Sequence, residues 1–170
     1  MAASGVISST HRVLLADIMQ GVYGDATTAN AAKTGLPITS WAVGEGGFQV
    51  VGGNKVPKTP NNALTDTEAN IAPAPIGLPP TSATGLRFTG IFVPGEVSVV
   101  GSTITATITL AAGTLGLDNN SKLTGNLGNP PELFEAMLFD GNGNAVAYFT
   151  YDQVVKLAAN TVVLTLTVAY

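Results

Sequence analysis

Few side chains in this sequence could do chemistry, and the only histidine is the first to consider. His11 is the single histidine, and there is no cysteine. A catalytic histidine needs a nucleophile and an orienting acid beside it in space, and no pattern in the sequence supplies them. Without cysteine, disulfides and thiolate metal ligands are excluded.

The second candidate is a calcium loop that starts at Asp140. Asp140, Asn142 and Asn144 match the first three ligands of such a loop. The glycine required next is replaced by Ala145, and the glutamate required at the twelfth position is replaced by Tyr151. The spacing therefore favours a tight turn over a metal site.

Paired carboxylates are the third candidate, because two of them can act as general acid and base. Glu132 and Glu135 have this character, but they follow Pro130-Pro131, and we interpret them as solvated residues at the entrance of a strand. The sequence 119–121 fits a glycosylation sequon, which has no meaning without a secretory route. We predict no enzyme activity, no cofactor, no metal and no catalytic residue, and the partner-binding residues stay unknown.

Stretch 130–151 contains the strongest structural signal. Two apolar runs, LFEAMLF and AVAYF, flank the sequence DGNGN, and Asp, Asn and Gly favour the positive φ of tight hairpin turns. The pattern predicts a β-hairpin in which Gly141 or Gly143 has positive φ. Neither face of its first strand is cleanly polar, so we expect both faces to be covered.

The same stretch carries a family resemblance. It has an acidic residue, an alternating apolar strand, a D-x-x-G turn and a second strand that runs to a lysine: Glu132 or Glu135, 139–143, 146–148 and Lys156. Upstream lie ITSWAVGEG at 38–46, Thr59-Pro60 and Ala63-Leu64. These segments resemble the N-terminal attachment domain of phage tail-collar and tail-fibre proteins, over residues 6–170. Such fibres usually continue into a shaft and a receptor-binding tip, which these 170 residues do not include.

The remaining elements follow from periodicity. Residues 8–20 are predicted to form one helix, with a Ser/Thr cap, an apolar stripe and Gly21 at its end. The glycines at 44–53 predict a turn, and 38–43 a strand that contains Trp41. Residues 57–80 hold six of the ten prolines and predict a long extended arm.

Strands are predicted throughout 85–170. Residues 86–93 form one strand, which Pro94-Gly95 breaks. In 102–110 and 161–168, apolar residues alternate with Thr or Val, which predicts strands with one buried face. Residues 113–129 are expected to form a long loop.

Charged residues are unusually scarce. They make up 11% of the chain, against about 25% in typical soluble domains; the net charge is -4 and the mean hydropathy +0.33. A lone domain normally has a charged surface, so we expect assembly with other subunits. Seven scattered basic residues argue against nucleic acid, and no apolar run approaches the roughly 20 residues that span a bilayer. We expect neither a signal peptide nor membrane insertion.

The sequence thus predicts one mainly β domain over 1–170, an antiparallel β-sandwich-like fold with a minor helical part. The resemblance implies a structural virion protein: a tail-fibre, collar or baseplate component for host attachment, located in the virion tail and assembled in the host cytoplasm. Its partners would be its own copies, as a homotrimer, and other tail, baseplate or collar proteins. Two alternatives stay open: a carbohydrate-binding adhesion sandwich, for which Trp41 or Tyr23 would have to be exposed, and a capsid decoration protein.

Overall fold

The computed structural model describes residues 3–7, 38–60, 86–100, 103–114, 130–141 and 143–169. These residues contain ten strands and no helix: β1 (Ala3–Ile7), β2 (Ile38–Gly44), β3 (Phe48–Val51), β4 (Asn54–Pro57), β5 (Leu86–Ile91), β6 (Val97–Val100), β7 (Thr103–Leu110), β8 (Glu132–Asp140), β9 (Ala145–Val155) and β10 (Val162–Ala169). The described part of the chain accordingly includes no helix that could cross a membrane. The predicted mainly β, antiparallel fold is confirmed. The predicted helix at 8–20, the arm beyond residue 60 and most of the loop at 113–129 lie outside the described residues.

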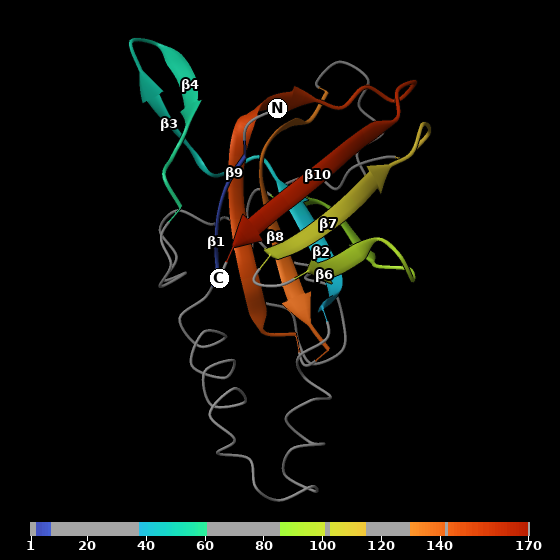
Figure 1. Ribbon diagram of the computed structural model, residues 1–170. Coiled ribbons are helices and arrows are strands. Elements are labelled where there is room, and N and C mark those ends of the chain that lie inside the picture. Colours follow the sequence, from blue (N-terminus) through green and yellow to red (C-terminus); the bar gives the residue numbers. More distant parts are fainter. Residues whose placement is uncertain are drawn as a thin grey trace, which may run out of the picture.

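The largest sheet has five strands in the order β1-β9-β8-β2-β5, all antiparallel to their neighbours (Figure 1). Strands β8 and β9 form the predicted hairpin, with Leu138 opposite Ala147. In its turn, the Asp140 carboxylate accepts a hydrogen bond from the Asn144 backbone amide, with a length of 2.9 Å, and further bonds from the Asn144 side chain. The Asp140 side chain therefore caps the turn.

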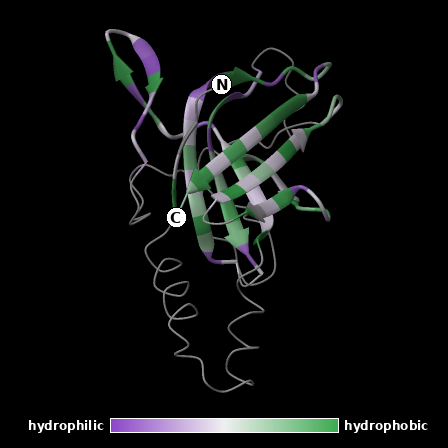
Figure 2. Cartoon of the chain, viewed as in Figure 1, coloured by the Kyte–Doolittle hydropathy of each residue, from purple (hydrophilic) through white to green (hydrophobic). Residues whose placement is uncertain are grey.

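A three-stranded antiparallel sheet has the order β10-β7-β6. Its strands show the predicted alternation: the residues of β7 and β10 that face the large sheet are buried, namely Ile104, Ala106, Ile108, Leu110, Leu164, Leu166 and Val168. The hydropathy colours of both strands alternate in the same way (Figure 2). Burying one side of each strand fixes the register, because a slip by one residue would turn every apolar side chain outward.

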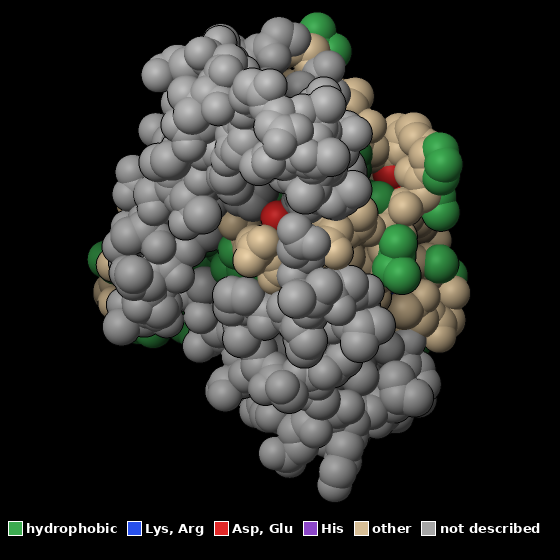
Figure 3. All heavy atoms as spheres, turned by 90° about the horizontal axis from the view of Figure 1, so that it is seen from below, with side chains coloured by type: hydrophobic (Ala, Val, Ile, Leu, Met, Phe, Trp, Pro, Cys, Tyr) green, Lys and Arg blue, Asp and Glu red, His purple; other side chains and the backbone are tan. Residues whose placement is uncertain are grey.

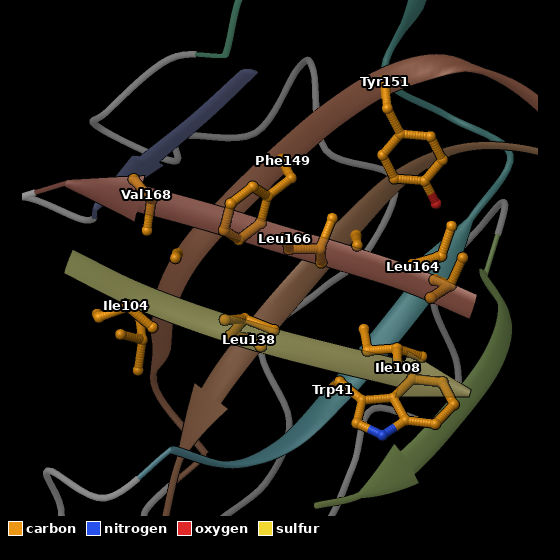
Figure 4. Packing of buried hydrophobic residues seen from close by; sticks show 14 of the residues in the cluster. Trp41, Ile104, Ile108, Leu138, Phe149, Tyr151, Leu164, Leu166 and Val168 are labelled. Carbon is orange, nitrogen blue, oxygen red and sulfur yellow. The ribbon is translucent and has the colours of Figure 1, made fainter. Parts of the chain in front are cut away.

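The main core lies between these two sheets. Leu138, Phe149 and Tyr151 of the large sheet face Leu164 and Leu166 of the small one (Figure 4). Trp41 belongs to the same cluster and is 9% exposed. Its indole lies against Gly90 of β5, where an added Cβ would come within 2.3 Å of the ring. The neighbouring strand therefore needs a glycine at this position to accommodate Trp41.

The opposite face of the large sheet is also buried around its centre. Ala42, Met137, Phe139 and Tyr148 form a second apolar cluster there, with exposed fractions of 2% or less. Residues 133–140 of β8 are all buried. The expectation that both faces of this hairpin are covered is confirmed.

Strands β3 and β4 form a separate two-stranded hairpin, which stands away from the two larger sheets (Figure 1). The predicted glycine turn is present, with φ of 59° at Gly52 and 84° at Gly53. The strands on either side of this turn were not predicted. Pro57 is the last residue of β4, a position that needs no ladder amide.

Some strands and strand ends differ from the prediction. Strand β1 was not predicted, because ASGVI has few β-type residues; it pairs with β9, and Gly5 lies against the Phe149 ring. Strand β5 ends at Ile91, two residues before the expected end. The next amide, that of Phe92, donates a hydrogen bond to the Thr39 carbonyl. Strand β6 follows the turn at Pro94-Gly95.

The turn of the β8–β9 hairpin provides a stability prediction. Gly143 is buried and has φ of 80°, whereas Gly141 does not have positive φ. A β-branched residue is excluded from positive φ, so Gly143→Val should lower the free energy of unfolding by more than about 1 kcal/mol. Gly141→Val, the matched control, should cost less in urea denaturation. Equal losses for the two variants would contradict this turn geometry.

Candidate functional site

A buried polar cluster surrounds Glu135, in the middle of the large sheet. The Glu135 side chain is fully buried. Its Oε1 accepts a hydrogen bond from the Gly46 backbone amide at 2.9 Å, and its Oε2 accepts one from the Tyr148 hydroxyl at 2.7 Å. The Glu135 backbone carbonyl accepts a third, from the Tyr151 hydroxyl at 2.9 Å. The interpretation of Glu135 as a solvated edge residue is therefore wrong.

The Glu135 carboxylate is stable there because donors replace the water that it loses. An isolated buried carboxylate is strongly destabilising, and hydrogen bonds from positioned donors compensate for much of that cost. Tyr148 donates to the carboxylate, whereas Tyr151 donates to the backbone carbonyl of the same residue. The two rings lie on opposite faces of β9, because their positions differ by an odd number of residues. Burial, and then the nearby Glu135 charge, raise the pKa of Tyr151 well above its usual value. The Tyr151 hydroxyl thus keeps its proton and remains a donor.

This cluster positions the loop that leads into β3. Gly47 has φ of 75°, and a Cβ added there would lie 2.9 Å from both the Glu135 Cβ and the Tyr148 hydroxyl. The Gly47 carbonyl accepts a hydrogen bond from the Lys58 amide, and the Lys58 carbonyl accepts one from the Thr150 hydroxyl. Both ends of the β3–β4 hairpin are therefore tied to β8 and β9.

Aromatic and charged side chains fix the base of the same hairpin. The rings of Phe48 and Phe134 lie 5.0 Å apart, and Lys55 Nζ is 4.9 Å from the Phe48 centroid. Lys55 also forms an ion pair with Glu132. Both partners are about two-fifths exposed, so this pair adds little stability. Glu132 is thus a partly solvated residue, in agreement with the prediction.

The tip of the hairpin presents apolar side chains to solvent. Val50 and Val51 are 64% and 56% exposed. A two-stranded hairpin is marginally stable alone, and the contacts at its base compensate for this. The cluster around Glu135 therefore acts as an anchor that holds a projecting hairpin.

Lys156, the lysine of the family resemblance, is also buried. Its Nζ donates a hydrogen bond to the Leu157 carbonyl at 2.8 Å, and its backbone amide donates to the Pro131 carbonyl. Burial lowers the pKa of the Lys156 ammonium. These bonds fix the end of β9 beside the start of β8.

Several other positions singled out in the sequence are not covered by the structure. His11, Tyr23, Asn142 and the sequon at 119–121 lie outside the described residues. Among the residues that are described, no group of three or more His, Cys, Asp or Glu could hold a metal ion. Sequence analysis missed the Glu135 anchor, because its donor at Gly46 is 89 residues away along the chain. The glutamate within an apolar run was the only available signal.

Comparison with known proteins gives no relative: no family model, no curated protein and no solved structure matches the chain.

The anchor leads to a second stability prediction. Glu135→Gln replaces one acceptor oxygen with an NH2 group, which cannot accept the hydrogen bond that Gly46 or Tyr148 donates at that position. Leaving a buried donor unsatisfied should lower the free energy of unfolding by about 1–3 kcal/mol. Glu132→Gln removes the same charge from an exposed pair and should cost at most about 1 kcal/mol. Chemical denaturation measures both, and equal stability of the two variants would show that Glu135 is no anchor.

Proposed function

We propose that the chain is a structural virion protein of a tailed phage, an attachment or connector component of the tail fibre, collar or baseplate. It acts through protein–protein assembly and carries out no reaction. Its partners are further copies of itself, in a homotrimer, and neighbouring tail proteins.

The observation that carries this proposal is the proximity of the two segments on which the resemblance rests. ITSWAVGEG contains β2, and the second segment contains β8 and β9. Strand β2 pairs with β8, with Gly44 opposite Glu135. The Gly46 amide then donates to the Glu135 carboxylate. Two segments about 90 residues apart thus form one structural unit, which supports a single shared motif over two chance similarities.

The exposed apolar side chains also support assembly. Among the residues that the structure describes, eight large hydrophobic side chains are more than two-fifths exposed: Val50, Val51, Ile91, Val93, Val100, Val155, Leu157 and Val163. On the face shown in Figure 3, the described side chains are mainly hydrophobic or neutral, with little acidic and no basic surface in view. Such surfaces favour contact with other protein.

The finer features of the fold belong to the same proposal. We expect a sandwich-like domain with a helix at residues 8–20, and a proline-rich arm at residues 57–80 that lies along its own domain or a neighbouring subunit. Apolar residues in that segment, such as Ile71 and Ile76, would contribute to the contact.

The carbohydrate-binding alternative has less support. Glycan sites use exposed aromatic rings, and Trp41 is instead a core residue packed on Gly90. A capsid decoration protein would share the charge-poor composition of a tail protein. Only the location of the chain in the particle can distinguish these two functions.

Two measurements test this function. Light scattering after size exclusion should give a trimer at high protein concentration, and a monomer throughout would contradict self-assembly. Immunogold labelling of particles made from the genome that encodes the chain should place it on the tail. Label on the capsid shell would establish the decoration alternative, and purified particles without label would refute a virion role.

A further inference from the structure

The outer face of the three-stranded sheet consists of the side chains that point away from the core: positions 98 and 100 of β6, alternate positions 103 to 109 of β7, and alternate positions 163 to 169 of β10. The register aligns them in rows, for example Ser98, Thr105 and Thr167. All ten are Thr, Ser, Val or Ala, and each is exposed or half-buried. These ten positions therefore carry no charge, and each is at least partly exposed.

Its composition differs from that of a face built only for solvent. The solvated side of an antiparallel sheet is usually polar, and exposed charges such as lysine normally prevent association through sheet edges. Here Val100 and Val163 are 75% and 56% exposed. The edge strand β6, with the sequence VSVV, has neither a charge nor a proline.

Hydrogen bonding satisfies part of the face internally. The hydroxyls of Thr105 and Thr167 lie 3.4 Å apart across β7 and β10. This pair leaves its two methyl groups available for packing, and covering it with another protein surface costs less in lost hydrogen bonds to water than covering unpaired hydroxyls.

We propose that copies of this chain meet through the outer face of the three-stranded sheet, around their symmetry axis. The proposal rests on the self-assembly in the proposed function and assigns it a surface. Near a symmetry axis, a side chain faces the same side chain of another copy, and like charges brought together there repel. A different partner could offer opposite charges, whereas a self-facing surface requires their absence.

The size of the face sets the expected strength. Eight residues of β7 span about 27 Å and three strands about 14 Å, which gives a flat area of about 400 Å². One side of a stable interface buries about 800 Å². The face alone should therefore support a concentration-dependent association.

Adding charge to the face tests the proposal. The double variant Thr107→Lys with Thr165→Lys places two lysines on neighbouring positions of β7 and β10. The control, Gln49→Lys with Gln153→Lys, adds the same charge at exposed positions on β3 and β9. In sedimentation velocity, with circular dichroism to verify folding, we expect self-association at least tenfold weaker for the first variant and little changed for the control.

Single cysteines give a second test that does not depend on the lysine variants folding, since the chain has no cysteine of its own. Under mild oxidation, Thr165→Cys should form disulfide-linked dimers and Gln153→Cys should not. Unchanged association of the threonine double variant, or cross-linking by Gln153→Cys and not by Thr165→Cys, would overturn the assigned surface while self-assembly stands. A monomeric unaltered protein would overturn both.

Discussion

The structure depends on a strand that has no solvent-facing side. Residues 133–140 of β8 are buried on both faces of the five-stranded sheet, although antiparallel sheets commonly leave one face to water. One face is covered by the three-stranded sheet, through Leu164 and Leu166. At the Glu135 end of the other face, the loop at 45–47 and residue Lys58 lie over the strand. A strand of this kind organises its surroundings, because every neighbour must supply either apolar contact or a hydrogen bond.

The Glu135 carboxylate has the most demanding requirement. Burial without donors would destabilise the fold, and the donors come from β9 and from the loop after β2. This links the β8–β9 hairpin to the loop after β2, 89 residues away along the chain, and sets the direction in which the β3–β4 hairpin leaves the sheet. The outer face of the three-stranded sheet is different, because its side chains carry no charge. It therefore lacks the repulsion between like charges that keeps exposed β-strands of two molecules apart. The anchor thus stabilises the domain, and the outer face of the three-stranded sheet is the surface that we propose for assembly.

Local patterns in the sequence were sufficient to predict several elements. Strict alternation in β7 and β10 identified both their type and their buried sides, and DGNGN located the hairpin turn. The pairing of strands that are distant in sequence could not be predicted. No local sequence pattern indicates that β10 pairs with β7 or that β1 pairs with β9. The β3–β4 hairpin was missed because its strands have four residues each and several of their side chains are exposed. Glu135 was misassigned because its environment is formed by residues remote in sequence.

Hydrogen exchange of the backbone amides tests most directly whether β8 is the centre of the structure. Residues 136–138 should exchange only through global unfolding, and should be the slowest in the domain. The amides at 49–51 of the projecting hairpin should exchange much faster, through local opening. If the amides of β8 exchanged as fast as those of β3, the doubly buried strand could not be the element on which the fold depends.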